Sequence, residues 1–416
     1  MNILHLMPYC PVPPIFGGAL RIYYLLKTMV DQHSVTVLTY GSEADRRGML
    51  DAFGGRIKAV HMIPHRWIAR FRRLGQLYAL CTNQSYFGFL THRREMQELI
   101  DRLLSSEEFD IVQSEFPMMA SFDFKTDAVK IMDAHNVEYD NFRRMWQNVR
   151  SFVRRAHYHR EYRAFFLEEL EACRKQDALF VTSTRDRDLF DLHHPHLPKY
   201  VVPNGVDTEY FRPSEDNSEP SSLVFTGMMG YVPNYDGMLY FLDEIFPLIQ
   251  REVPDAKIYI VGNRPPQELL RRRSLNVVVT DFVPDVRPYI QRASVYVVPL
   301  RMGGGTRLKV VEAMAMKKPI VTTSVGCEGI EVEHGATAYV EDDPRRFAER
   351  VVELMRSPLV RRQFVERGYE LVRSRYDWRV VGDGMHQLYQ QLVSHKKEPR
   401  TIVSEKEEQP IVVHGA

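Results

Sequence analysis

Two patterns of hydrophobic and polar positions alternate along this chain. Short runs rich in β-branched and aromatic residues are typical of buried strands, and longer segments with apolar residues at helical spacing follow them. The clearest case is SVYVVPLRMGGGTRLKVVEAMAMKKPIVTTSVG, residues 294–326. It predicts a strand at 294–300, a glycine loop, a helix that begins at Thr306 and that Pro319 ends, and a second strand. This order indicates a parallel α/β sheet.

The same order opens the chain. MNILHLMP predicts a first strand, Gly17 and Gly18 stand in the loop after it, and a helix and the strand VTVLTY follow. The predicted packed face of that helix holds Leu20, Tyr23, Tyr24 and Met29. The loop lacks the spacing of a dinucleotide site, so it does not indicate NAD. Gly17 and Gly18 serve either close packing of strand and helix or the approach of a ligand, and the sequence leaves both open.

The length of the chain extends this pattern to two domains. With 416 residues, of which 44% are apolar, the chain has material for two hydrophobic cores. We predict an α/β fold with two domains, the first of which opens in a Rossmann-like order. In the first domain we predict one long arginine-rich helix from Tyr139 to Lys175, with or without an interruption. Residues 396–416 are predicted to be a disordered tail.

The glycine loop before the predicted helix is a candidate anion site. Free N–H groups and the dipole at a helix N-terminus attract negative charge. Gly303, Gly304 and Gly305 allow a ligand to approach the backbone closely, and Thr306, at the predicted helix start, is a further donor-binding candidate. Arg307 and Lys309 follow, and two cations beside such a loop suit a diphosphate.

A carboxylate follows the two cations. Glu312 lies five residues after Arg307, where it can accept hydrogen bonds from a ribose diol. The alternative is that Arg307 and Lys309 are solvated helix residues and that Glu312 has no special partner. A glycine triplet alone does not decide between the two interpretations.

The same segment resembles the donor-site signature of retaining GT-B glycosyltransferases of family four. The resemblance rests on Glu312-Ala313-Met314-Ala315 and on Pro319-Ile320-Val321. V-P-N-G-V-D at 202–207 resembles the segment at the domain junction of these enzymes. The family carries an earlier Glu that contacts the transferred sugar, and here Gly304 takes its place. The GGGTRLK variant resembles a bacterial subgroup associated with exopolysaccharides.

The resemblance implies a GT-B fold and further site residues. Two Rossmann-like domains would face a central cleft, with the acceptor on 1–200, the nucleotide-sugar donor on 201–376, and a helix at 377–395 crossing back to the first domain. Other implied donor contacts are Gly17, Gly18, Gly227, Asn234, Phe282 and Val283. Backbone around the last two would meet the nucleobase.

One histidine belongs to the same comparison. His135 ends a predicted strand, where open α/β sheets bind ligands, and D-A-H-N-V-E at 133–138 resembles the family's active-site histidine segment. The resemblance implies that His135 faces the transferred sugar, although a lone histidine is more often structural. Glu138 is either a first-turn acid of the next helix or a site residue, and both interpretations stay open.

The resemblance implies a reaction. The protein would move a sugar from a nucleotide-sugar donor to a glycan or lipid-linked acceptor with retention of anomeric configuration, in polysaccharide biosynthesis. Arg307 and Lys309 would neutralise the diphosphate, so no metal and no cofactor are expected. The alternatives are an inverting transferase or epimerase of the same fold, and a nucleotide-sugar-binding protein without turnover. Gly304 keeps the last alternative open.

Charge adds a second prediction. Net charge is only +1, but no Asp or Glu occurs between Ala52 and Arg94. Residues 64–80 put apolar and basic side chains together, which suits an anionic membrane surface, although an ordinary core-facing helix fits as well. The membrane or acceptor candidates are Trp67, Arg70, Arg72 and Arg73. No nucleic-acid motif accompanies the charge.

The remaining composition indicates a cellular location. The four cysteines have no ligand spacing and are typical of reduced thiols in a cytoplasmic protein. We find neither a signal-peptide pattern nor a stretch of 18 apolar residues. The prediction is therefore a cytoplasmic protein, with peripheral contact at the inner face of the cell membrane left open.

Overall fold

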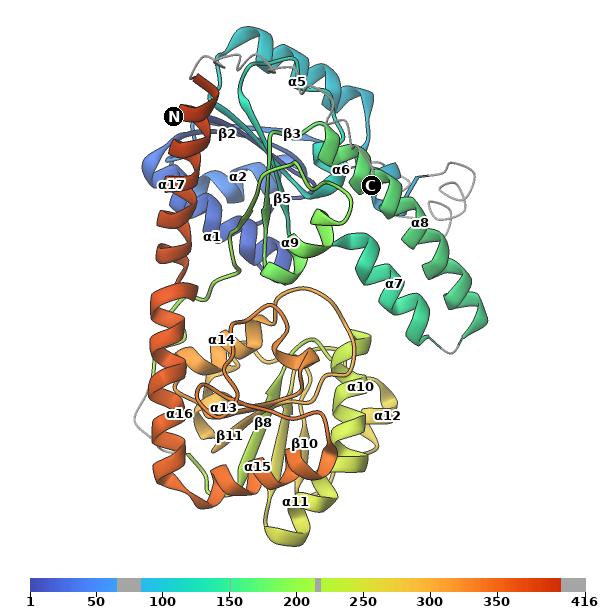
Figure 1. The fold of residues 1–416 in the computed structure, drawn as a ribbon, viewed down its shortest axis with the longest axis vertical. Helices are drawn as coiled ribbons and strands as arrows, with labels where there is room; N and C mark the ends of the chain where they lie inside the picture. The colour runs from blue at the N-terminus through green and yellow to red at the C-terminus, as the bar shows by residue number, and fades with distance from the viewer. Residues whose placement is uncertain (66–83, 150, 214–217, 398–416) are drawn as a thin grey trace, which may run out of the picture.

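The computed structural model describes residues 1–65, 84–149, 151–213 and 218–397. Within these ranges the chain forms two parallel β-sheets, each covered by helices (Figure 1). The first sheet lies above the second in this view, and the last two helices, Pro358–Leu371 and Trp378–Lys397, follow one another along one side. The molecule is therefore an α/β protein with two sheets, as the sequence predicts.

The N-terminal sheet has the strand order β3-β2-β1-β4-β5-β6-β7, and every neighbouring pair is parallel. Its strands are β1 Asn2–Met7, β2 Ser34–Tyr40, β3 Ala59–Ile63, β4 Ile111–Glu115, β5 Val129–Ala134, β6 Ala178–Val181 and β7 Lys199–Val201. All five residues of β4 are buried, because helices cover both faces of a parallel sheet. This burial carries polar as well as apolar side chains into the core.

Helices of the N-terminal half pack on this sheet. They are α1 Gly17–Gln32, α2 Glu43–Ala52, α4 Tyr86–Thr91, α5 Arg94–Ser106, α6 Phe116–Ala120, α7 Glu138–Asn148, α8 Phe152–Arg174 and α9 Thr184–Asp191. The predicted packed face of α1 is partly wrong. Met29 is buried, but Leu20, Tyr23 and Tyr24 are only half-buried. The buried face instead follows Ile22, Leu25, Leu26, Met29 and Val30, with Arg21 beside it.

The predicted helix from Tyr139 to Lys175 is interrupted. It forms α7 and α8, which lie side by side as a hairpin that extends away from the sheet (Figure 1). Val149 and Ser151 have extended backbone angles, so the helix stops and restarts there. Phe142 stacks on Phe165 with ring centres 5.1 Å apart, and this contact holds the two helices together.

The C-terminal sheet has the order β10-β9-β8-β11-β12-β13 and is also parallel. Its strands are β8 Ser222–Thr226, β9 Lys257–Val261, β10 Val277–Val279, β11 Val295–Val298, β12 Ile320–Thr322 and β13 Tyr339–Val340. Its helices are α10 Val232–Tyr240, α11 Phe246–Glu252, α12 Gln267–Leu270, α13 Arg287–Arg292, α14 Leu308–Ala315, α15 Pro344–Arg356 and α16 Pro358–Leu371.

A last helix, α17 Trp378–Lys397, returns to the N-terminal half and packs against α1. Its start is fixed by the junction segment. A Cβ atom at Gly205 would lie 2.7 Å from the Trp378 ring, so only glycine allows this approach. Tyr24 stacks on the same ring at 5.3 Å and donates to Asp207, 3.1 Å away. Among the described helices, none combines the length and apolar content that a membrane span requires.

Candidate functional site

Both sheets place glycine loops where the strand order reverses. In the N-terminal sheet β1 and β4 are neighbours, although the chain continues from β1 to β2 on the other side. In the C-terminal sheet β8 and β11 are related in the same way. Parallel sheets bind ligands beyond the carboxyl ends of such strands. Gly17 follows β1, Gly227 follows β8, and Gly304 follows β11, so each of these predicted residues lies at one of the two switch points.

The loop after β11 is longer than predicted. Helix α14 begins at Leu308, not at Thr306, so Thr306 and Arg307 belong to the loop. Gly303 and Gly305 have φ of +114° and +75°. Glycine adopts these angles at little cost, and an α-helix cannot include them. The Thr306 hydroxyl is buried and has no hydrogen-bond partner among the described residues.

Arg307 is buried in this loop, with 6% of its surface exposed. Nη1 donates to Gly304 O at 2.8 Å, and Nε donates to Val325 O at 3.1 Å. Nη2 has no hydrogen-bond partner among the described residues, and the carboxylate of Glu328 is 3.8 Å away. Burial lowers the pKa of Arg307. A buried cation with an unused donor is expected where an anion binds.

Lys309 lies two residues further, in the first turn of α14. Its Nζ donates to Asn234 Oδ1 at 2.8 Å and sits 3.9 Å from the centre of the Phe225 ring. A Cβ atom at Gly227 would lie 2.9 Å from this Nζ, so the glycine makes room for the lysine. Burial, with help from the charge of Arg307, lowers the pKa of Lys309 to about 7. The structure thus brings Gly227, Asn234 and Lys309 together.

Glu312 is the carboxylate of this group. Burial raises its pKa to about 7, although Lys309 opposes that shift. It is half-buried, and no hydrogen bond of its side chain to another described residue is found. Arg307, Lys309 and Glu312 therefore form a small charged group whose polar atoms are incompletely partnered.

The N-terminal switch point carries a buried chain of three side chains. Glu115, the last residue of β4, accepts from His5 Nε2 and from His135 Nε2, each at 2.5 Å. Burial alone would raise the pKa of Glu115, but the two imidazoles hold this pKa well below its ordinary value. His135 Nδ1 is buried without a partner among the described residues. The carboxylate thus fixes the orientation of the His135 ring and leaves one nitrogen open.

A second buried pair braces the same strand ends. Arg21 of α1 and Asp133 of β5 are almost completely buried, and Arg21 Nη2 donates to Asp133 Oδ1 at 2.8 Å. Arg21 Nη1 also donates to Asn204 Oδ1 at 3.1 Å in the junction segment. His5, Arg21 and Glu115 were not predicted from the sequence as parts of one site. Their signal in the sequence is that they are polar residues inside otherwise apolar elements.

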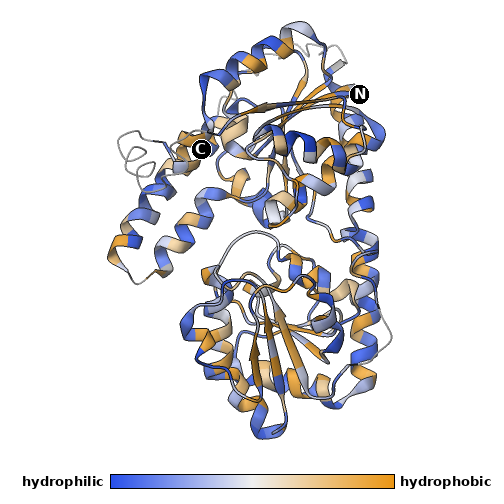
Figure 2. Ribbon diagram, turned by 180° about the vertical axis from the view of Figure 1, so that it is seen from behind, coloured by the Kyte–Doolittle hydropathy of each residue, from blue (hydrophilic) through white to orange (hydrophobic). Residues whose placement is uncertain are grey.

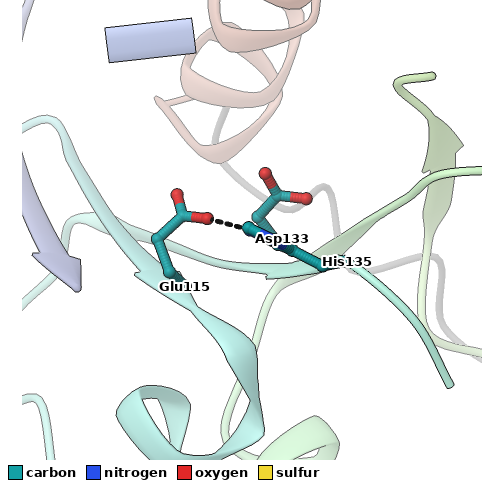
Figure 3. A group of neighbouring side chains, drawn as sticks. All are labelled: Glu115, Asp133 and His135. Carbon is teal, nitrogen blue, oxygen red and sulfur yellow. Dashed lines mark hydrogen bonds and ion pairs between the residues drawn. The ribbon is translucent and has the colours of Figure 1, made fainter. Parts of the chain in front are cut away.

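Glu115, Asp133 and His135 bring possible metal ligands within 4.8 Å of one another (Figure 3). Their atoms are already engaged, however. Asp133 faces the guanidinium of Arg21, and both oxygens of Glu115 accept from imidazoles. A cation here would have to displace Arg21 and would meet its charge, so these residues do not fit a metal.

The two halves meet at the glycine loop. A Cβ atom at Gly304 would overlap Asn141 Oδ1 of α7, and one at Gly305 would overlap Asn136 Oδ1. Arg144 of α7 donates to Gly303 O at 3.1 Å and makes two 2.9 Å bonds to Glu328. These contacts place the loop beside the segment that follows His135.

Gly17 and Gly18 have different surroundings. A Cβ atom at Gly17 would lie 3.8 Å from Leu308 Cδ1 in the C-terminal half, in ordinary contact across the junction. A Cβ atom at Gly18 would overlap the Tyr9 hydroxyl, so this glycine is needed for packing. Gly18 is thus closely packed and Gly17 lies at the junction, and a ligand contact of either glycine stays a prediction.

Two groups of predicted residues lie away from these contacts. Phe282 and Val283 follow β10 at the sheet edge. The Phe282 side chain is 70% exposed, and Val283 packs partly on the C-terminal core. Within the described part of the chain, we find no contact from either residue to Arg307 or Lys309. Trp67, Arg70, Arg72 and Arg73 lie outside the described residues.

Comparison with known proteins gives this site a context. Residues 220–357 match the family model described as glycosyl transferases group 1. An uncharacterized 44.6 kDa protein in the cps region of Klebsiella pneumoniae is 21% identical over 89% of this chain and 95% of that protein. A phosphatidyl-myo-inositol mannosyltransferase of Mycobacterium leprae is 26% identical over 45% of this chain and 52% of that protein.

Solved structures share the fold. A sucrose-phosphate synthase of Thermosynechococcus elongatus superposes with a TM-score of 0.65 at 15% identity, over 95% of this chain and 100% of that one. HepE of Anabaena, in complex with UDP, gives a TM-score of 0.62 at 13% identity, over 94% of this chain and 100% of that one. These likenesses confirm the predicted GT-B fold.

Proposed function

We propose a specific reaction for this chain. The match over residues 220–357 and the named relatives identify the chain as a glycosyltransferase. It moves a sugar from a nucleotide-sugar donor to a glycan or lipid-linked acceptor, and the product keeps the anomeric configuration of the donor. The relative from a cps region supports a role in polysaccharide biosynthesis. The C-terminal loop would hold the donor, and the N-terminal switch point would hold the sugar and the acceptor.

The observation that carries the proposal is the unused donor of Arg307. Its Nη2 is buried without a hydrogen-bond partner among the described residues, at the switch point of a sheet and beside Lys309. A diphosphate would supply the missing acceptor. As the sugar–oxygen bond breaks, negative charge grows on the leaving nucleoside diphosphate, and two fixed cations stabilise that charge. With this pair in place, no metal is required.

The other residues have complementary roles in the proposal. The half-buried carboxylate of Glu312 would accept from the ribose hydroxyls of the donor. His135, oriented by Glu115, would face the transferred sugar through its free Nδ1. The HepE structures that contain UDP and UDP-glucose support a nucleotide sugar as the ligand class.

One observation favours a second candidate. Gly304 offers no side chain to a sugar, as would be expected of a nucleotide-sugar-binding protein that has lost turnover. Release of nucleoside diphosphate in the presence of acceptor separates the two. An inverting transferase or an epimerase of the same fold is separated by the stereochemistry of the product.

Membrane contact is the second part of the proposal. Between Asp140 and Glu161 the chain has six arginines and no acidic residue. This stretch includes the free end of the α7–α8 hairpin, where some of the residues are hydrophobic (Figure 2). There Phe152 and Val153 are 84% and 76% exposed. Apolar side chains flanked by arginines suit the surface of an anionic bilayer.

Vesicle binding tests this contact. Sedimentation with phosphatidylglycerol vesicles should capture the protein, and salt should weaken the binding because the attraction is partly electrostatic. Phe152→Ser with Val153→Ser should reduce capture, whereas Leu275→Ser, at a residue that is 93% exposed in the C-terminal half, should not. Changing Arg70, Arg72 and Arg73 to Glu tests the segment outside the described residues. Unchanged capture in both multiple mutants would refute the membrane proposal.

The donor site is tested by ligand-induced stabilisation. A ligand that binds only the folded state raises the melting temperature. We expect one nucleoside diphosphate of a panel of UDP, ADP and GDP to stabilise the wild type, and Arg307→Ala and Glu312→Ala to lose that shift. The matching nucleotide sugar should then release nucleoside diphosphate when a glycan acceptor is added. The absence of any shift across the panel would overturn the proposed function.

A further inference from the structure

Side chains from the N-terminal half lie beside Gly304 and Gly305 in the C-terminal half. Two amides fill the space where side chains at these positions would lie: Asn141 Oδ1 opposite Gly304 and Asn136 Oδ1 opposite Gly305. Both asparagines come from the segment after His135. Glycine thus lets these amides approach the backbone of the loop across the junction.

The two asparagines also lie beside a carboxylate. Asn136 Nδ2 donates to Glu138 Oε1 at 3.4 Å, and Asn141 is near enough to the same carboxylate to lower its pKa. Burial raises the pKa of Glu138, and these amides oppose the rise. Glu138, Asn136 and Asn141 therefore form one polar group that faces the glycine loop.

Glu138 is not the cap of its helix. The backbone N–H groups of Glu138 and Tyr139 at the start of α7 both donate to Glu169, at 3.0 and 2.8 Å. No side chain caps this helix from the preceding residue. Glu138 is thus a first-turn acid of α7, as one of the two interpretations expects. Because Glu169 accepts from the first N–H groups, the Glu138 carboxylate is left for other donors.

The surroundings of Glu138 lie between the two proposed subsites. Burial raises the pKa of Tyr231, in the C-terminal half, and the charge of Glu138 adds to this while that of Arg307 opposes it. His135, in the N-terminal half, acts on Glu138 in turn and lowers its pKa. Glu138 is thus near His135 in its own half and near Tyr231 in the C-terminal half.

We propose that Glu138, beside Asn136 and Asn141, accepts a hydrogen bond from a hydroxyl group of the transferred sugar. The inference rests on the proposed function and deepens it. A carboxylate repels a diphosphate but is a strong acceptor for hydroxyl donors, so the sugar is the part of the donor that fits it. The N-terminal half would in this way supply the carboxylate that Gly304 does not.

The test separates binding of the nucleotide from binding of the sugar. Glu138→Gln keeps the size of the side chain and removes its charge. With whichever nucleoside diphosphate stabilises the wild type, titration calorimetry should give a Kd for Glu138→Gln within about twofold of wild type. For the matching nucleotide sugar, kcat/KM should fall by about 10- to 100-fold, the usual weight of a hydrogen bond to a charged group.

A control variant and a second test variant complete the experiment. Glu171→Gln, at an exposed residue of α8, should change neither quantity. If Glu138→Gln melts early, Asn141→Ala serves as the second variant and should lower kcat/KM with the Kd of the free nucleotide kept. Unchanged kcat/KM in Glu138→Gln, or a parallel loss of nucleotide affinity, would overturn the assignment. A wild type that binds no nucleoside diphosphate would instead overturn the proposed function on which it rests.

Discussion

The two switch points of this molecule treat buried charge in opposite ways. In the N-terminal half, Glu115 and Asp133 are fully buried and each carboxylate is satisfied by side chains of the protein. In the C-terminal half, Arg307 and Glu312 are left with polar atoms that no described residue satisfies. The carboxylates of the first arrangement are satisfied without a ligand, although His135 Nδ1 is not, whereas the cation of the second keeps an unused donor. This difference supports the proposal that the C-terminal half binds the diphosphate and that the N-terminal half orients His135.

The N-terminal arrangement is also tied to the rest of the fold. Gln113 donates to Glu115 at 2.9 Å, and the Tyr389 hydroxyl of α17 donates to Gln113. Arg21 reaches the junction segment at Asn204. The helix that crosses back and the segment that joins the halves therefore both support the strand ends that carry His135.

The largest effect is expected from breaking the buried N-terminal pair. Arg21→Ala leaves Asp133 charged and unpaired in the core, which costs about 3–5 kcal/mol of unfolding free energy. Urea denaturation measures this loss. Arg46→Ala, which breaks an exposed pair with Glu43, is the matched control and should leave the denaturation midpoint nearly unchanged. Equal midpoints for the two variants would mean that the buried pair does not support the fold.

Arg307→Ala should act on function and not on stability. The variant removes a buried cation whose donors are only partly used, so the urea midpoint should stay or rise. Turnover should fall by about 100- to 1000-fold, as when one donor to a developing negative charge is removed. Arg301→Ala, in an exposed pair with Asp236, is the control. A large loss of stability with full turnover would reverse the comparison between the two halves.

The contact between the halves gives the third prediction. In Gly304→Ala the new methyl group overlaps the Asn141 amide, so this side chain must leave its position. We expect turnover to fall by roughly 10- to 100-fold, because small misplacements of reacting groups are costly. Asn141→Ala should restore part of the loss in the double variant, and Gly48→Ala, with open space around it, should be neutral. A double variant no better than Gly304→Ala would show that the two residues do not meet.

The smallest effect concerns pH. Lys309 and Glu312 both have a pKa of about 7, one lowered and the other raised by burial. A diphosphate needs protonated Lys309, so its affinity should fall by about tenfold per unit above pH 7. Below pH 7 protonation of Glu312 should weaken the ribose contact. Calorimetry from pH 6 to 8.5 measures the loss of affinity on both sides of pH 7, and the apparent pKa values belong to the interacting pair. Lys309→Arg should abolish the loss of affinity above pH 7. An unchanged loss in this variant would exclude Lys309 as its cause.

Local patterns predicted the parts of the site that are close in sequence. Arg307, Lys309 and Glu312 lie within six residues, so their proximity follows from the loop and helix alone. The glycine loops were correctly placed after strands, although the start of α14 was predicted two residues early. Gly303 and Gly305 adopt positive φ and delay the helix, which the letters of the sequence do not specify.

The rest of the site depends on long-range packing that no local pattern reports. His5 and Glu115 are separated by 110 residues, and they meet only because β1 and β4 are neighbours at the switch point. Arg21 and Asp133 are buried side chains in elements that look apolar, so periodicity treats them as exceptions. The place of Asn141 opposite Gly304 depends on how the two halves close.

Hydrogen–deuterium exchange with two ligands tests most directly whether the C-terminal half binds the nucleotide and the N-terminal half binds the sugar. The free nucleoside diphosphate that stabilises the protein should protect residues 227–234 and 303–312. The matching nucleotide sugar should protect these and also 135–141, because only the sugar reaches His135 and Glu138. This result would support a donor held by the C-terminal loop and a sugar held by the N-terminal half. Protection of 135–141 by the free nucleoside diphosphate, with 303–312 unchanged, would contradict the account.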